Sequence, residues 1–349
     1  MKKLFGLSVF VIASLVMLFM SCKKEKIESP QSKDQVVQEN STLEKSINHN
    51  NAVNNALIEI YSSSDHFNDM AVAPDGSVYA VGQKIVVIKN GQTLEYVAPS
   101  PLFSVFPVSA NEAWAVGNSL ILHYDGVNWT SKSVPCAGVL CRVWGYDGQI
   151  FITGGVGIVG YSGHVGFILQ LVNDNFVKKA ELVDASFLGM NAYNGSNQLY
   201  IAGSYMSPAD HVERPALFVF SNNSIEKVNE IFEYNNGNSG NRLEKTPSGS
   251  FLMSTTDHYY FGNDLYLIGA GINYVRTPYN GSSRSLSSDG DKLLMANENG
   301  VRMTYKNNLN GNSTVIIASQ NCFDVEYINH KIYILAMANG QWKIKTLNY

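Results

Sequence analysis

The residue types that could support catalysis or metal binding gather in one short segment. Asp210, His211 and Glu213 lie close together, and carboxylates beside an imidazole can bind a metal ion or move a proton. A loop of mixed charge is, however, more often simply solvated. The pair Asp257 and His258 forms no stronger set, and the chain has neither a G-x-S-x-G nor an H-E-x-x-H pattern. We therefore expect no catalytic set, no bound metal and no cofactor.

The first 22 residues indicate export. Lys2 and Lys3 precede an apolar stretch that stops at Ser21 and Cys22, and this layout is typical of a secretory signal. A cysteine directly after the break resembles a bacterial lipoprotein signal. That resemblance implies that residues 1–21 are removed and that Cys22 is acylated, which anchors the chain to the membrane. A plain signal peptide or a membrane anchor is the alternative. Residues 22–54 are polar and are expected to form a flexible tether.

Two further cysteines are close in sequence. Cys136 and Cys141 lie in the segment PCAGVLC. In an exported chain they can form a disulfide, which would stabilise so small a loop by about 2 kcal/mol, or they can be two buried thiols. Cys322 stands alone, and no second Cys or His pair has the spacing of a zinc site.

A short motif of turn residues followed by an apolar run recurs along the chain. It reads VYAVG, AWAVG, IFITG, LYIAG, FLMST, LLMAN and IYILA, starting at residues 78, 113, 150, 199, 251, 293 and 332. A period near 40 residues with several short strands per unit is typical of a β-propeller. The run is apolar on both faces, as expected for a strand that neighbouring blades cover on each side. The second unit shows four strands, at 102–108, 112–116, 119–124 and 129–134.

These spacings predict an all-β fold, a seven-bladed β-propeller of four-stranded blades over residues 55–349. The last unit has room for only one more strand after its motif, within Gln341–Leu347. The strand-like segment Leu57–Tyr61 belongs to no unit, so we expect it to pair with that strand, complete the last blade and remove an exposed sheet edge. The segment NDLYLIG at 263–269 also resembles the motif, and six or eight blades are the alternatives. The layout of Trp114, His123 and Trp129 resembles units of secreted bacterial propeller proteins, which implies the same fold.

The long connections are expected to gather on one face of the ring. They are residues 154–164, 204–215, 233–241 and 269–281, which we assign to the connections of blades three to six on the side of the wide channel mouth. Loops on a rigid scaffold often carry recognition, and these are rich in Tyr, Asn, Gly and Ser. The candidate ligand-binding residues are Tyr161, His164, Tyr205, His211, Arg214, Tyr234 and Arg276, with Trp144 on a channel-lining strand. Further channel candidates are Asp69, Arg142, Arg242, Glu244, Asp324 and Glu326.

The net charge and the expected location of the protein limit the classes of partner that it can bind. The net charge is −4 and no stripe of Lys or Arg follows the N-terminus, so we expect no nucleic-acid partner. We expect a lipid-anchored protein of the cell envelope, at the outer membrane, that binds a protein or glycan partner through the long loops. The alternative is a glycoside hydrolase or lyase, which requires carboxylates such as Asp210, Glu213, Glu233 or Glu244 to converge at the channel mouth. A third alternative is a structural subunit of an envelope assembly.

Overall fold

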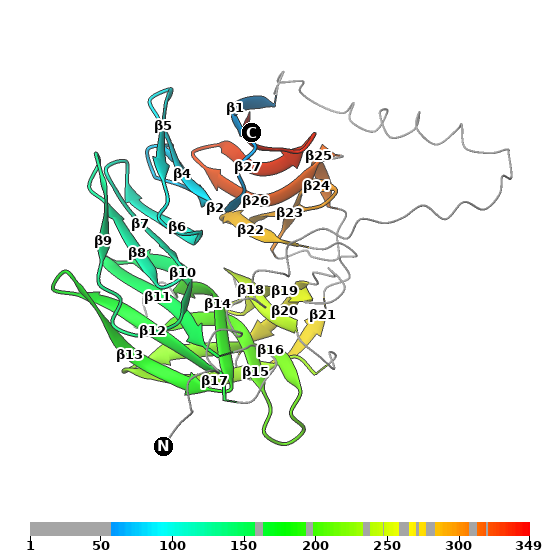
Figure 1. Ribbon diagram of the computed structural model, residues 1–349. Coiled ribbons are helices and arrows are strands. Elements are labelled where there is room, and N and C mark those ends of the chain that lie inside the picture. Colours follow the sequence, from blue (N-terminus) through cyan, green and yellow to red (C-terminus); the bar gives the residue numbers. More distant parts are fainter. Residues whose placement is uncertain are drawn as a thin grey trace, which may run out of the picture. The chain divides into compact units, whose positions relative to one another are not determined.

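The computed structural model describes residues 57–157, 163–192, 198–232, 238–246, 248–257, 265–269, 272–276, 283–306, 313–318 and 320–349. The regular structure of these ranges is β-strand, arranged as seven four-stranded sheets. The sheets are the blades of one propeller (Figure 1), as the repeat spacing predicts. Within the described ranges no helix has the length and apolar character needed to cross a membrane.

The strands of each blade follow one another from the channel outward. Blades one to four are β2 (Phe67–Val72), β3 (Val78–Gly82), β4 (Lys84–Lys89), β5 (Gln92–Val97); β6 (Leu102–Ser109), β7 (Glu112–Gly117), β8 (Leu120–Tyr124), β9 (Trp129–Lys132); β10 (Val139–Tyr146), β11 (Gln149–Val156), β12 (Val165–Val172), β13 (Asn175–Val183); and β14 (Ala185–Ala192), β15 (Leu199–Met206), β16 (Glu213–Ser221), β17 (Ser224–Glu230). Blades five to seven are β18 (Asn238–Lys245), β19 (Phe251–Asp257), β20 (Leu265–Gly269), β21 (Ile272–Arg276); β22 (Ser285–Asp289), β23 (Lys292–Asn297), β24 (Gly300–Tyr305), β25 (Thr314–Ala318); and β26 (Asn321–Ile328), β27 (Lys331–Ala338), β28 (Gln341–Asn348), β1 (Ile58–Ser63).

The core consists of hydrophobic clusters between adjacent blades. The innermost strands contact one another around the ring, and β26 contacts β2 to close it. Along β3, Tyr79 and Val81 pack toward blade two, whereas Val78 and Ala80 pack toward blade seven. Second strands are therefore apolar on both faces because each face is covered by a neighbour, as the sequence motif predicts.

Strand β1 closes the ring. It pairs antiparallel with β28, with Ile58 opposite Thr346 and Ser63 opposite Trp342. Figure 1 shows β1 beside the C-terminal strands. The predicted pairing of the N-terminal segment with Gln341–Leu347 is thus confirmed, and β28 has no free edge.

The glycine that ends the motif in the first four blades has a steric cause. A β-bulge in the inner strand brings a backbone carbonyl against the end of the second strand. A Cβ on Gly117 would lie 2.2 Å from the oxygen of Pro101, and one on Gly203 would lie 1.8 Å from the oxygen of Ser186. In blade five Thr255 ends the motif, and its partner on the inner strand is Gly240.

Replacing Gly203 with Ala is expected to lower the free energy of unfolding by about 1–3 kcal/mol, because backbone must move to admit the methyl group. Gly269→Ala is the matched control, since its Cβ would meet its neighbours at 3.4–3.5 Å, an ordinary contact distance. Urea denaturation measures both variants. Equal losses would contradict the steric explanation.

Two sequence-based expectations need correction. The segment 269–281 is not a single connection between blades five and six, because β21 lies within it and supplies the fourth strand of blade five. Half of 204–215 is also strand, since β15 extends to Met206 and β16 begins at Glu213. The ambiguous segment 263–269 contains β20, the third strand of blade five.

Candidate functional site

The channel has a mouth built from one residue of each blade. In six blades a β-bulge near the start of the inner strand leaves one residue out of the pairing register, and in blade six Arg284 holds the corresponding position just before β22. These seven residues line a cavity of about 320 Å³. They are Asn68, Phe103, Cys141, Leu188, Asn241, Arg284 and Phe323.

The mouth opens on the face where the inner strands begin, which we call the bulge face. Val139 at the start of β10 pairs with Gly155 near the end of β11. The end of β11 and the start of β12 therefore lie on this face, as do residues 207–212 between β15 and β16, because second strands end where inner strands begin. The predicted grouping of these two connections beside the channel mouth agrees with the strand register.

The residue after each bulge forms a polar layer below the mouth. Its members are Asp69, Ser104, Arg142, Gly189, Arg242, Ser285 and Asp324. Asp69 accepts hydrogen bonds from Nη1 of Arg142 at 2.8 Å, from Nη2 of Arg242 at 2.9 Å and from the backbone N–H of Val105 at 2.9 Å. This single carboxylate, 1% exposed, therefore joins blades one, two, three and five across the channel.

A second carboxylate extends the layer through blades six and seven. Asp324 accepts a hydrogen bond from the hydroxyl of Ser285 and another, at 3.0 Å, from the backbone N–H of Met70. Its Oδ2 lies 3.8 Å from Nη2 of Arg242. Burial raises the pKa of Asp324 to about 7, although Arg242 opposes this shift and the charge of Asp69 adds to it.

The next channel layer also holds carboxylates with raised pKa values. Burial raises the pKa of Glu326 well above its ordinary value, and the charge of Asp324 adds to the shift. Burial also raises the pKa of Glu244, while Lys306 and Ser288 act in the opposite direction. Perturbed carboxyls often mark functional sites, but buried ion-pair networks produce the same shifts. Here Asp324 is 2% exposed, which favours the structural role.

The mouth itself is rich in cations. Arg142, Arg242 and Arg284 all line the cavity, while the carboxylates of the polar layer lie behind them. The guanidinium of Arg284 donates to Oδ1 of Asn321 and lies over the ring of Phe323, 4.5 Å from its centroid. Burial lowers the pKa of Arg284, and the charge of Glu298 opposes that shift. Among the described residues that line the cavity, these three arginines are the charged ones and none is a carboxylate, a lining that favours anions.

Of the predicted ligand-binding residues, Trp144 lies on an inner strand and His164 is buried. Trp144 is on β10, in the layer of Glu326, with its ring 6.4 Å from that of Phe106 and stacked on Tyr146. His164 is 3% exposed, and its carbonyl accepts the backbone N–H of Asp184. Burial of His164 removes it from the accessible surface of the bulge face.

Tyr205, His211 and Arg214 form part of a tightly bonded connection. Arg214 is 7% exposed, forms an ion pair with Asp210 and lies over the ring of Phe232 at 5.1 Å. Tyr205 packs at the edge of the cluster between blades three and four, and the ammonium group of Lys227 lies over its ring, 4.1 Å from the centroid. His211 occupies a left-handed turn position with φ of 55°. The guanidinium of Arg214 is thus engaged inside the protein and serves the loop's structure.

The remaining predicted residues are placed only in part. Arg276 ends β21, the outermost strand of blade five. Tyr161, Tyr234 and the lipidation residue Cys22 lie outside the described residues.

Three of the four carboxylates proposed for hydrolysis belong to the described residues, and these three do not converge on one site. Glu213 is buried and accepts the hydroxyl hydrogen of Ser204, and Asp210 is paired with Arg214. Glu244 accepts hydrogen bonds from Ser288 at 2.6 Å and Lys306 at 3.3 Å. Glu233 lies outside the described ranges.

Cys136 and Cys141 are free thiols in the structure rather than a disulfide. Cys141 holds a bulge position and faces the mouth, whereas Cys136 packs against the cluster between blades two and three. The two side chains therefore belong to different environments despite their closeness in sequence. Burial raises the pKa of Cys141 to about 12, which makes it a weak nucleophile.

Comparison with known proteins supports the fold and assigns no family. No family model and no curated protein matches the chain. The extracellular domain of BT4673 from B. thetaiotaomicron, described as a hybrid two-component system, aligns with a TM-score of 0.59 and 11% identity over 84% of this chain and 40% of that one. The Cps50 (Swd1) β-propeller domain of Myceliophteria thermophila aligns with a TM-score of 0.56 and 9% identity over 83% and 99%. The Dos1 propeller aligns with a TM-score of 0.53 and 10% identity over 80% of this chain and 77% of that one. The chain thus spans about two-fifths of the length of the first of these, and identities this low show a shared fold alone.

Anion binding at the mouth is expected to weaken as the pH rises through about 7. Asp324 has a raised pKa, so it is neutral at lower pH and gains a negative charge near Arg242 as the pH increases. The charged groups around it are Arg242, Asp69 and Glu326. One added charge a few ångströms from the anion costs on the order of 1 kcal/mol, or roughly fivefold in affinity between pH 6 and pH 8.

Titration calorimetry with sulfate at the two pH values measures this change, since sulfate carries the same charge at both. Asp324→Asn is expected to abolish most of the difference, because the amide cannot ionise. An unchanged pH dependence in that variant would exclude Asp324 as its source.

Proposed function

We propose that this chain is an exported, lipid-anchored binding protein whose channel mouth takes the acidic sugar ring of an envelope glycan. The observation that carries the proposal is the presence of Arg142, Arg242 and Arg284 in one cavity. Arginine binds carboxylates through charge-assisted, often bidentate hydrogen bonds.

The rest of the lining suits a sugar that carries such a carboxylate. Phe103 and Phe323 offer apolar ring surface, and Asn68 and Asn241 offer amide groups. A uronic acid presents a C–H face, hydroxyl groups and one carboxylate, which match these three kinds of side chain. A cavity of about 320 Å³ is near the lower end of the range for small-molecule pockets, which favours one or two sugar units over an extended peptide.

Export and anchoring are supported by the sequence before residue 55. The lipoprotein-like signal ending at Cys22 supports attachment to the envelope, and the similarity to an extracellular domain fits an exported location. The long connections of blades three to six extend the contact surface in this proposal, because two of them lie on the bulge face. An acidic protein segment is the alternative ligand, and it is tested alongside.

The test is titration calorimetry of the mature chain with trigalacturonate and, separately, with tetraglutamate, at pH 6.5 and at low and high salt. We expect trigalacturonate to bind, with affinity that falls as salt rises. Arg284→Gln is expected to weaken it about 10- to 100-fold, because a hydrogen bond to a charged group contributes about 1.5–3 kcal/mol. Lys132→Gln is the matched control, since Lys132 lies on outer strand β9 and pairs with Asp174.

Three results would count against the proposal. Absence of binding by trigalacturonate would contradict it, and so would binding that Arg284→Gln and Lys132→Gln weaken equally. Tighter binding of tetraglutamate with the same dependence on Arg284 would reassign the mouth to an acidic protein segment.

A further inference from the structure

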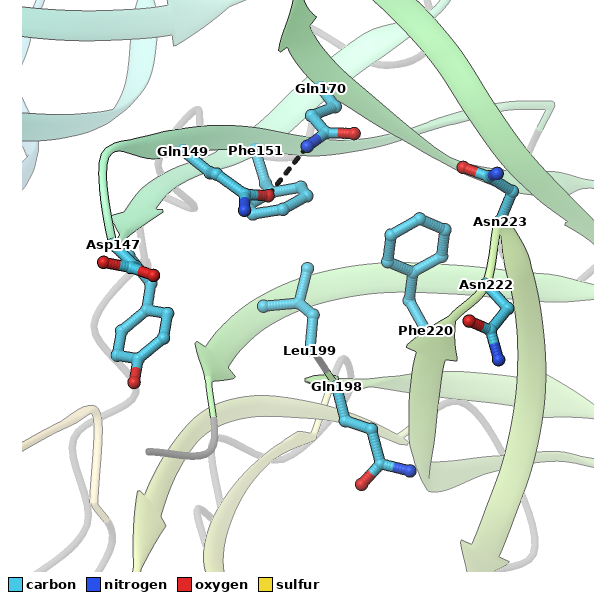
Figure 2. Close-up of a pocket in the computed structure, with 10 residues that line it drawn as sticks. Asp147, Gln149, Phe151, Gln170, Gln198, Leu199, Phe220, Asn222 and Asn223 are labelled. Carbon is cyan, nitrogen blue, oxygen red and sulfur yellow. Dashed lines mark hydrogen bonds between the residues drawn. The ribbon is translucent and has the colours of Figure 1, made fainter. Parts of the chain in front are cut away.

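A second cavity lies between blades three and four, on the face opposite the mouth. It has a volume of about 260 Å³. Asp147 lies in the turn from β10 to β11, and Asn222 and Asn223 form the turn from β16 to β17. Both turns lie on the face where the inner strands end, away from the bulges, so the cavity is separate from the arginine site. Figure 2 shows its lining.

The floor of this cavity is apolar and well packed. The rings of Phe151 and Phe220 meet edge to face with centroids 6.3 Å apart, and Leu199 completes the floor. Figure 2 shows these three side chains at the centre of the lining. Phe151 and Phe220 belong to different blades, so the floor is the exposed end of the hydrophobic cluster between them.

The rim is made of primary amides. The Nε2 group of Gln170 donates to Oε1 of Gln149 at 2.8 Å, which orients both side chains (Figure 2). Gln198, Asn222 and Asn223 add three more amides. Each primary amide carries two donors and one acceptor oxygen, a combination that suits hydroxyl groups. Among the described lining residues Asp147 alone is charged at neutral pH, so the rim lacks the cations that an anionic ligand would need.

The rim is also held in place by tight turns. Asn222 and Asn223 have φ values of 51° and 58°, and Asp147 and Gly148 have 50° and 71°. Two successive positive φ values are the signature of two-residue hairpin turns that match the twist of the strands. A rim that is already ordered loses little entropy when a ligand binds.

An aromatic pair borders the site. Tyr146 lines the cavity, and its ring is stacked on Trp144 with centroids 5.9 Å apart and an angle of 4° between the planes. Aromatic surface beside amide groups provides both the apolar contact and the hydrogen bonds that a sugar ring requires.

We propose that the cavity between blades three and four binds one ring of a neutral saccharide, independently of the arginine mouth. The ring lies over Phe151 and Phe220, and its hydroxyl groups bond to the amides of the rim. The volume is slightly below the range of pockets for drug-sized ligands, which fits a single ring with the rest of the glycan outside.

The test is titration calorimetry and tryptophan fluorescence of the mature chain with maltotriose, cellotriose and N,N′-diacetylchitobiose. We expect at least one of these to bind and to change the emission of Trp144, because its stacking partner borders the cavity. Asn223→Gly keeps the positive φ but removes the amide, and Gln170→Met keeps the side-chain volume; each is expected to weaken affinity at least fivefold.

Asn173→Gly is the matched control. Asn173 has φ of 49° in the turn from β12 to β13 of blade three, and it does not belong to the described lining. Affinity within twofold of the unsubstituted protein in this control and in Arg284→Gln supports a separate neutral site. Binding of none of the three saccharides overturns it, as does equal weakening by Asn223→Gly and Asn173→Gly. Loss in Arg284→Gln alone would place neutral sugars at the mouth and also overturn it.

Discussion

Replacing Asp69 with Ala is expected to lower the free energy of unfolding by about 3–5 kcal/mol, the usual cost of removing one partner of a buried ion pair. The carboxylate is 1% exposed and binds Arg142, Arg242 and the N–H of Val105. Without it two guanidinium groups, each less than a fifth exposed, lose their shared counter-ion. Guanidinium denaturation followed by tryptophan fluorescence measures the loss.

Glu181→Ala is the matched control for Asp69→Ala. Glu181 pairs with Lys178 on the surface and its side chain is 52% exposed, so its removal is expected to cost below about 1 kcal/mol. If both variants lost similar stability, Asp69 would contribute no more than a surface ion pair does, and the polar layer would not hold the blades together.

Removing β1 is expected to produce the second large effect. A chain that begins at Asp65 lacks the strand whose residues pair with β28 from Trp342 to Thr346. A net contribution of about 1 kcal/mol per hydrogen bond predicts a loss on the order of 3–5 kcal/mol. The uncovered edge of β28 is also expected to pair with other chains, which gives concentration-dependent dimers. Thermal unfolding and light scattering measure the two consequences.

A chain that begins at Leu57 keeps β1 and serves as the control. It is expected to unfold at the temperature of the mature chain and to stay in the same oligomeric state. Equal unfolding temperatures for the chains beginning at Leu57 and at Asp65 would show that the pairing of β1 with β28 does not stabilise the propeller.

The fold was predictable because one strand in each blade is covered on both faces. That environment requires a continuous apolar run, such as VYAVG at Val78–Gly82, and the run recurs at a regular spacing. The closing strand was predictable from the number of strands in each repeat unit, since the last unit lacks a fourth strand. The assignment of 269–281 was wrong because β21 is a five-residue strand with Gly and Pro nearby and no alternating pattern to mark it.

Part of the candidate site also follows from the inner strands. Asp69, Arg142, Arg242 and Asp324 are charged residues on four different inner strands, and the structure brings them together in one layer. The bulge residues were missed, because a bulge shifts the side-chain alternation by one residue. Phe103 and Leu188 look like core residues in sequence, yet the bulge turns them toward the mouth.

Two of the predicted loop residues have contacts inside the protein that the sequence does not reveal. Arg214 and His164 have the side-chain chemistry of a binding site, but in the fold both side chains are covered by neighbouring residues. Arg214 faces Asp210 and Phe232, and His164 is buried. Sequence pattern identifies a polar side chain on a loop and carries no information on whether that loop folds back on it.

The most direct measurement is a crystal structure of the mature chain soaked with trigalacturonate. We expect one uronate ring in the channel mouth, with its carboxylate within hydrogen-bond distance of Arg284 and of Arg142 or Arg242. A ring bound away from these arginines, or an empty mouth at a concentration that saturates the protein in solution, would contradict the assignment of the mouth as an acidic-glycan site.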